Sequence, residues 1–185
     1  MGPMTGRRQR ETYRHGDLAA EAATAAYDLV RSGGLKAMTV RAVADQVGVT
    51  HRALYNHFAD RDALVDAVAE RGFLELAAHL RTASSRAAFI RGYLTFAQTQ
   101  PGLDEAMVSR PHATMRDRPT LQTAVHLGLD EARRLFGDPS QTSEQNRRAV
   151  MKVIMLLRGG IAMRSALDLA DDEGLITELI AMVDG

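Results

Sequence analysis

Apolar residues recur at intervals of three and four positions along most of this 185-residue sequence, in segments separated by glycine, proline and capping residues. This spacing places apolar side chains on one face of an α-helix. The pattern therefore predicts an all-α fold of about nine helices. The predicted helices cover approximately residues 16–31, 40–47, 51–58, 60–82, 84–98, 103–108, 121–136, 142–169 and 172–183.

The stretch 39–58, with the sequence TVRAVADQVGVTHRALYNHF, predicts two short helices joined by a tight turn. Its first half has apolar residues at i, i+3, i+4 and i+7, and Thr39 precedes them as the expected N-cap. Gly48 follows, where a left-handed residue ends a helix at little conformational cost. Thr50 is placed to cap the second helix. The stretch therefore predicts a helix-turn-helix.

The second helix of this pair has few residues to bury, because only Ala53, Leu54 and Phe58 are apolar enough to face a core. Arg52 can donate two hydrogen bonds to guanine, and Asn56 can pair with adenine. The outward side chains are His51, Arg52, Tyr55, Asn56 and His57. This polar face, which includes no acid, is typical of a helix that reads the major groove of DNA.

The net charge of zero is unevenly divided, with +3 over residues 1–59 and −3 over residues 60–185. The basic part includes the predicted helix-turn-helix, which favours a polyanionic partner. Residues 1–15 contain four arginines and little that is apolar, and predict a mobile arm. The arm either is a disordered tail or reaches phosphates or the minor groove of DNA.

The composition suits a globular protein of the cytoplasm. Apolar residues make up 45% of the chain and cysteine is absent, so neither a disulfide framework nor a thiolate metal site is available. Residues 1–13 are polar and basic, and we expect no secretory signal. The most apolar run, 150–157, is far shorter than the roughly 20 residues that cross a bilayer, so we expect no membrane association.

Motifs of enzyme sites are missing from the sequence. It contains no His-Glu-x-x-His, no glycine-rich phosphate loop and no Gly-x-Ser-x-Gly, and His79, His112 and His126 are not at i, i+4 spacing. We therefore expect no enzymatic activity, no metal site and no cofactor.

The block TVRAVADQVGVTHRALYNHFADRDALVDAV resembles the DNA-binding domain of the tetracycline-repressor (TetR) family. The family pattern is met by Thr39, Ala44, Gly48-Val49-Thr50, Leu54-Tyr55-Asn56-His57-Phe58 and Asp60-Arg61-Asp62-Ala63-Leu64. The resemblance implies a three-helix DNA-binding domain at 16–59, supported by a connecting helix at 60–82. It also implies an effector-binding and dimerisation domain at 84–185.

Residues for DNA binding follow from the resemblance together with residue chemistry. Thr39, Thr50 and Arg61 are expected at helix N-termini, where unpaired N–H groups favour a phosphate oxygen. Alternatively, the two threonines are only caps and Tyr55 is an aromatic at the edge of the core. The predicted DNA-binding residues are Thr39, Arg41, Thr50, His51, Arg52, Tyr55, Asn56, His57 and Arg61.

The segment AFIRGYLTFAQTQPGL resembles the fifth helix of a TetR subgroup named for a Trp-His-Gly set, but Arg158-Gly159 stands where its His-Gly would align and tryptophan is absent. A pocket between the fifth, seventh and eighth helices is predicted, with His112, His126 and Arg158 as polar anchors. Its predicted ligand-binding residues are Phe89, Tyr93, Phe96, Met107, His112, His126, Met151, Met155 and Arg158. The alternative is that the aromatic and methionine side chains form ordinary core.

The resulting hypothesis is a homodimeric repressor that binds a pseudo-palindromic double-stranded operator and is released by a small, largely apolar effector. The resemblance implies dimerisation through the last two helices, the alternative being an intramolecular core. Gly159-Gly160 inside the eighth helix serves either a close dimer contact or the pocket. A DNA-binding regulator without an effector, governed by a partner protein or by abundance, is the alternative function.

Overall fold

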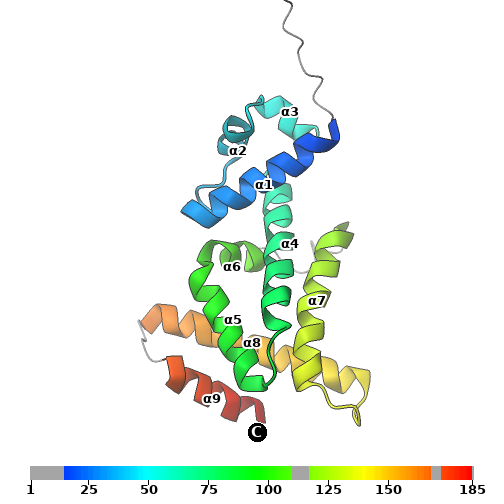
Figure 1. Cartoon of the computed structure of the whole chain (residues 1–185), viewed down its shortest axis with the longest axis vertical. Coiled ribbons are helices and arrows are strands. Elements are labelled where there is room, and N and C mark those ends of the chain that lie inside the picture. The colour runs from blue at the N-terminus through cyan, green and yellow to red at the C-terminus, as the bar shows by residue number, and fades with distance from the viewer. Residues whose placement is uncertain (1–14, 110–116, 168–171, 185) are drawn as a thin grey trace, which may run out of the picture.

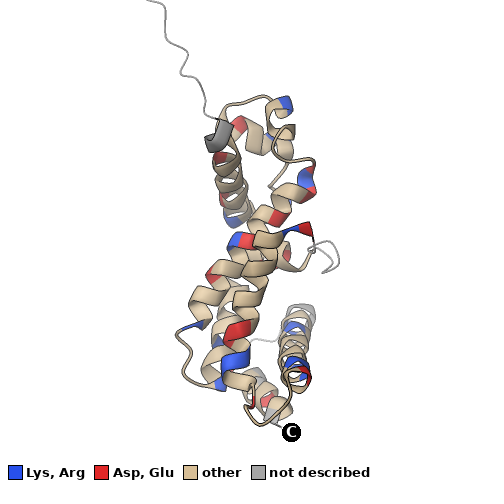
Figure 2. Ribbon diagram, turned by 90° about the vertical axis from the view of Figure 1, so that its right-hand side faces the viewer, with Lys and Arg blue, Asp and Glu red and all other residues tan. Residues whose placement is uncertain are grey.

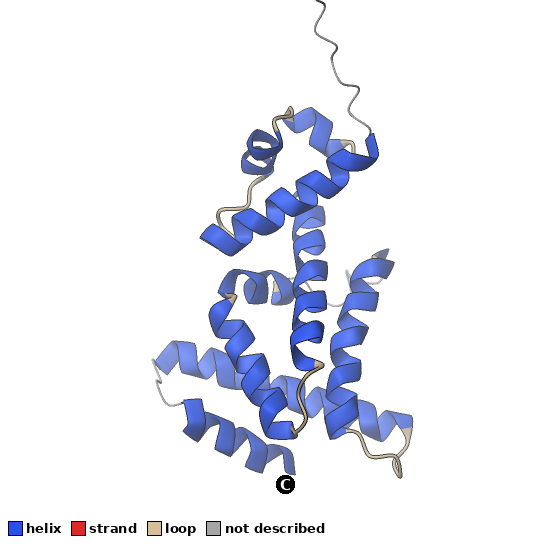
Figure 3. Cartoon of the chain, viewed as in Figure 1, coloured by secondary structure: helices blue, strands red, loops and turns tan. Residues whose placement is uncertain are grey.

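The computed structural model describes residues 15–109, 117–167 and 172–184. Helices make up all the regular structure in these ranges, which confirms the predicted all-α fold (Figure 1; Figure 3). The nine helices of the described residues are α1 (His15–Gly33), α2 (Val40–Val47), α3 (His51–Tyr55), α4 (Arg61–Leu80), α5 (Arg86–Thr99), α6 (Pro101–Val108), α7 (Pro119–Phe136), α8 (Ser143–Leu167) and α9 (Asp172–Asp184).

Helix α4 joins the two ends of the molecule (Figure 1). Helices α1 to α3 form a small bundle at its N-terminal end, where α1 packs against it, and α5, α6 and α7 pack along the remainder. Helix α8 crosses α5 and α7, and α9 lies against α5 and α8. None of the described helices is long and apolar enough to cross a membrane.

The helix-turn-helix forms through the predicted local interactions. The Thr39 hydroxyl accepts a hydrogen bond of 3.0 Å from the Ala42 N–H and caps α2. Gly48 ends α2 with φ 76°, in the left-handed region that glycine adopts without a Cβ clash. The Thr50 hydroxyl accepts a 3.3 Å bond from the Ala53 N–H at the start of α3. The structure thus confirms both caps and the turn.

Helix α3 is shorter than predicted and ends at Tyr55 rather than near Phe58. The backbone N–H groups of His57 and Phe58 both donate to the Leu54 carbonyl, which closes the helix in a tight turn. Phe58 is half-buried and packs against the core beside the fully buried Leu54. The inward direction of Phe58 was correctly predicted, but its position beyond the helix was not.

Two prolines that were predicted to lie in loops begin helices instead. Helix α6 starts at Pro101, not at Leu103, and α7 starts at Pro119. Proline is suited to the first helical position, because the N–H that it lacks would have no partner in the helix and its fixed φ is helical. The predicted break at Pro101-Gly102 is therefore only the junction at Gln100 between α5 and α6.

The start of α8 confirms the predicted capping box. The Gln145 N–H donates to the Thr142 hydroxyl over 3.2 Å, and the Thr142 N–H donates to the Gln145 side-chain oxygen over 2.8 Å. In α9, Ile176 and Leu179 are buried as predicted, at 4% exposure each. The start of α8 is thus fixed by hydrogen bonds between residues three positions apart.

Both ends of α4 are tied to neighbouring groups. An Asp60 carboxylate oxygen accepts a 2.8 Å hydrogen bond from the Ala63 N–H and caps its N-terminus. At the other end, the Arg134 guanidinium of α7 donates to the carbonyls of Leu80, Arg81 and Ala83. This arginine meets the carbonyls that the end of a helix leaves without helical partners.

Helix α1 is fixed to α4 and α6 by specific contacts. The Tyr27 hydroxyl donates to Glu75 over 2.6 Å, and the Arg71 guanidinium lies 3.6 Å from the centroid of the Tyr27 ring. On α6, a Cβ at Gly102 would lie 2.5 Å from the Val30 carbonyl oxygen. The backbone of α6 therefore approaches α1 more closely than any residue with a side chain would allow.

We predict opposite effects of alanine at two glycines. Gly102→Ala should lower the free energy of unfolding by about 1 to 3 kcal/mol, because the added methyl group meets the α1 backbone. Gly128→Ala, where a Cβ meets nothing within 4 Å, should raise it by about 0.5 to 1 kcal/mol through helix propensity. Urea unfolding of both variants measures the effects, and equal effects would contradict the close contact of α1 with α6.

Candidate nucleic-acid interface and internal pocket

Helix α3 presents a polar face to solvent. His51, Arg52, Tyr55 and Asn56 are exposed, with Tyr55 at 53%, whereas Leu54 on the opposite side is fully buried. His57 is half-buried. The short helix thus brings together on one surface the outward residues that the sequence predicted.

Bulk charge contributes little to this surface. Basic and acidic segments are interspersed over the whole ribbon (Figure 2). On α2, the exposed Arg41 forms an i, i+4 ion pair with Asp45 at 3.7 Å. Recognition by this face would therefore depend on individual hydrogen-bonding groups more than on a field of one sign.

Thr39 and Thr50 both act as helix caps, as one of the two interpretations expected. Each is exposed, and a hydroxyl that accepts from the backbone still has a proton to donate to a phosphate oxygen. The capping role is shown, and a phosphate contact stays a prediction.

Arg61 has a structural role that the sequence did not indicate. Its guanidinium donates to the Leu35 carbonyl over 2.8 Å and to the Met38 carbonyl over 3.1 Å. These carbonyls lie in the segment between α1 and α2, where helical hydrogen bonds are missing. The side chain therefore holds the α1–α2 connection against the start of α4, and its predicted phosphate contact would compete with these bonds.

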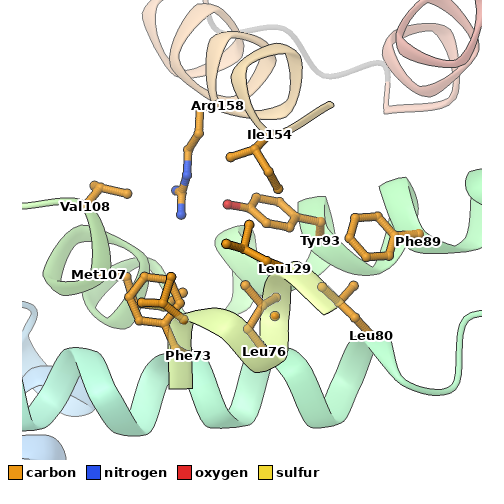
Figure 4. Close-up of a pocket in the computed structure, with 12 residues that line it drawn as sticks. Phe73, Leu76, Leu80, Phe89, Tyr93, Met107, Val108, Leu129, Ile154 and Arg158 are labelled. Atoms are coloured by element: carbon orange, nitrogen blue, oxygen red, sulfur yellow. The ribbon is translucent and has the colours of Figure 1, made fainter. Parts of the chain in front are cut away.

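A cavity of about 360 Å³ lies among the helices that follow the helix-turn-helix (Figure 4). Its walls come from α4, α5, α6, α7 and α8, and apart from two side chains they are apolar or glycine. The lining residues are Phe73, Leu76, Leu80, Phe89, Tyr93, Met107, Val108, Val125, Gly128, Leu129, Ile154 and Arg158. This size and lining are typical of sites for small organic molecules.

Tyr93 and Arg158 form the polar end of the cavity. Nη1 of Arg158 lies 2.5 Å from Oδ1 of Asp104, and its Cζ lies 5.2 Å from the centroid of the Tyr93 ring. Burial raises the pKa of the Tyr93 hydroxyl to about 12, with a further rise from Asp104 and an opposing effect of Arg158. Tyr93 therefore keeps its proton at neutral pH and can donate it in a hydrogen bond.

The structure shows which of the predicted pocket residues line this cavity, and ligand binding by them stays a prediction. Phe89, Tyr93, Met107 and Arg158 line the cavity. The predicted residues that do not line it are Phe96, His126, Met151 and Met155. His112 lies outside the described residues.

The errors have a physical cause. Helical spacing shows which residues share a face but not which neighbour that face meets. Ile154 and Arg158 direct one side of α8 to the cavity, whereas Met155 lies on another side and is 63% exposed. His126 is exposed on α7. The α4 side chains, above all Phe73, were missed because their spacing indicated only a core-facing stripe.

The described residues show no group of three His, Asp or Glu side chains placed to hold a metal ion.

Residues 23–68 match the model of the family described as bacterial regulatory proteins, tetR family. The tetracycline repressor protein class A from transposon 1721 of Escherichia coli is 42% identical over 55 residues, which are 30% of this chain and 26% of the repressor. The match thus spans about a quarter of that relative's length.

Solved structures resemble nearly the whole chain. A protein of unknown function from Rhodococcus sp. RHA1 is 26% identical with a TM-score of 0.65, over 94% of this chain and 95% of that one. A TetR variant from Acinetobacter baumannii AYE in complex with minocycline is 21% identical with a TM-score of 0.61, over 89% and 93%. The multidrug binding protein EbrR, complexed with imidazole, is 20% identical with a TM-score of 0.58, over 89% and 93%. The last two likenesses concern the fold alone.

The fold and the family match together define a helix-turn-helix protein of the DNA-binding class. Residues 23–68 of the chain carry the DNA-binding domain of the TetR family of bacterial regulatory proteins. The resemblance of residues 39–68 to the TetR DNA-binding domain is thereby confirmed, and the resemblance of the fifth helix to the Trp-His-Gly subgroup stays a prediction.

The Tyr93 hydroxyl predicts a pH dependence of stability. The folded protein holds this proton up to about pH 12, whereas an ordinary tyrosine loses it near 10.0. The folded state therefore binds more protons between these values, and the free energy of unfolding should fall as the pH rises through this window. Below it, the contribution should be constant.

Thermal unfolding of the wild type and of Tyr93→Phe from about pH 9 to about pH 11.5 measures this dependence. The wild type should lose stability relative to the variant as the pH rises. A constant difference across the range would contradict the buried, protonated hydroxyl.

Proposed function

We propose that this chain is a repressor that binds a pseudo-palindromic operator as a homodimer and leaves it when a small, largely apolar molecule occupies the cavity. One observation carries the proposal: near its N-terminus α4 packs against α1 and holds the α1–α2 connection through Arg61, and towards its other end it forms a cavity wall with Phe73, Leu76 and Leu80. A single helix thus joins the DNA-binding helices to the cavity.

In this proposal α3 reads bases in the major groove. Arg52 pairs with guanine, Asn56 pairs with adenine, and His51 meets a base or a phosphate. Thr39, Thr50 and Arg41 are exposed near the same surface and suit the flanking phosphates. Tyr55, His57 and Arg61 complete the set through backbone contacts or by positioning the neighbouring segments.

Release would be a population shift between two orientations of the DNA-binding helices. The effector favours the state in which α4 pivots, and α1 follows because Tyr27 and Gly102 tie it to α4 and α6. The two α3 helices of a dimer must stand roughly 34 to 36 Å apart to enter successive major grooves. A small rotation of α4 in each protomer would spoil that separation.

Dimerisation is assigned to α8 and α9. Met155, Met163 and Met182 are exposed on these helices at 63%, 55% and 52%, which is unusual for large apolar side chains. A Cβ at Gly159 would meet nothing within 4 Å in a single chain, and Gly159 does not line the cavity. Both observations support a close dimer contact at Gly159 rather than a role in the pocket.

DNA reading predicts a large effect of Arg52→Ala. This change should weaken operator binding by about 1 to 3 kcal/mol and relax the preference for the bound sequence, because it removes a bidentate contact to a base. Sequencing of bound genomic fragments identifies the operator, and titration of that operator and of random DNA measures both effects. Arg133→Ala, an exposed arginine on α7, is the matched control and should bind as the wild type does. An unchanged footprint for Arg52→Ala would contradict the assignment.

The dimer interface predicts that Met155→Glu produces monomers. A charge at the centre of an apolar interface loses its hydration without gaining a partner. Sedimentation equilibrium should show a dimeric wild type and a largely monomeric variant, with weaker operator binding. Leu127→Glu, at an apolar position of 38% exposure on α7, is the control and should stay dimeric. A dimeric Met155→Glu would exclude this face as the interface.

A further inference from the structure

The polar end of the cavity presents a hydroxyl that lacks a partner. Tyr93 is only 4% exposed, and its oxygen points to the side of the cavity where Arg158 enters (Figure 4). No described residue forms a hydrogen bond with this hydroxyl. Because the described residues contain no fully buried side-chain polar atom that lacks a partner, this hydroxyl oxygen is open to the cavity. A ligand atom can therefore accept its proton there without breaking a hydrogen bond within the protein.

The charge at this end of the cavity is already balanced. Arg158 is the only charged residue in the described lining, and its guanidinium is paired with Asp104 at 2.5 Å. The two side chains are 24% and 14% exposed, so water screens them little. The lining offers neither an unpaired acid to a cation nor an unpaired base to an anion.

We propose that the cavity selects an uncharged, largely apolar molecule with one oxygen that accepts a hydrogen bond from Tyr93, such as a ketone, ester or amide carbonyl. This inference rests on the proposed function, in which the cavity is the effector site, and it defines the chemical class of that effector.

Charged molecules of the same shape are disfavoured for separate reasons. A carboxylate at this end must compete with Asp104 for Arg158 or bring a second negative charge beside it. An ammonium group would lose its hydration among Phe73, Leu76 and Leu129 without meeting a free carboxylate. A carbonyl loses less hydration than either, and Tyr93 and the remaining N–H groups of Arg158 are available donors.

The size of the cavity indicates suitable probes. A volume of about 360 Å³ suits a molecule of two fused rings with a short substituent. Four naphthalenes with different 2-substituents test the inference: an acetyl group (neutral ketone), a carboxylate, an aminomethyl group (cation) and an ethyl group (hydrocarbon). Equilibrium dialysis gives each Kd, and release of the operator is measured in parallel.

The wild type should bind the ketone at least about tenfold more tightly than the carboxylate and the ammonium compound. Tyr93→Phe should weaken ketone binding by about five- to tenfold while leaving the hydrocarbon within about twofold, which also shows that the variant keeps its pocket. Asp104→Asn should improve carboxylate binding by at least about tenfold, because it leaves the guanidinium charge without a partner. The order of the Kd values of the four probes for the wild type tests the inference even if neither variant folds.

The inference is overturned if the carboxylate or the ammonium compound binds the wild type as tightly as the ketone, or if Tyr93→Phe leaves the ketone unaffected. Charged probes that bind and release the operator would leave the proposed effector site intact and refute only the class of ligand. If no probe binds, both the class of ligand and the cavity as an effector site for molecules of this size fail.

Discussion

The burial of α4 on several sides is the interaction on which the remaining structure depends. Its buried residues span the helix from Ala63 to Leu80, and neighbours cover it from α1, α6 and α7. Even a carboxylate, Asp66, is buried on it, where Arg118 at the start of α7 lies 3.5 Å away. A helix held in this way cannot bend to absorb a change locally, so a displacement at one end must shift the helices packed against it.

Two glycines show how closely the helices around α4 approach one another. A Cβ at Gly72 of α4 would lie 2.9 Å from the Met107 sulfur of α6, and Met107 also lines the cavity. Near the start of α6, Gly102 lies against the backbone of α1 at Val30. A molecule in the cavity would therefore contact a side chain that packs directly on α4 and belongs to the helix against α1. Helix α6 is therefore a second connection, besides α4, between the cavity and the DNA-binding helices.

Features that depend on neighbours in the sequence were predictable, and those that depend on distant segments were not. The caps at Thr39 and Thr50 and the pair Thr142–Gln145 each involve residues three positions apart. By contrast, Arg61 binds carbonyls 23 and 26 residues earlier, and Arg158 pairs with a carboxylate 54 residues earlier. The outward face of α3 depends on neighbours in the sequence. Once its one buried residue, Leu54, faces the core, the positions of the other side chains around this short helix are fixed. The cavity belongs to the second kind, because five helices contribute to its walls.

Arg158 shows why the fold of a regulator and its ligand are separate questions. In the sequence it is only a departure from the His-Gly of a related subgroup, but in the structure it meets Asp104 and lies beside Tyr93. Nearly all the other lining residues are apolar and would accept many molecules of suitable size. Selectivity must then come from the few polar groups, because an apolar wall discriminates weakly between molecules that differ by a polar atom, whereas a donor placed to bond the ligand discriminates strongly. A likeness in fold to proteins crystallised with minocycline or imidazole therefore carries no information about this ligand, whereas the identities of residues 93, 104 and 158 do.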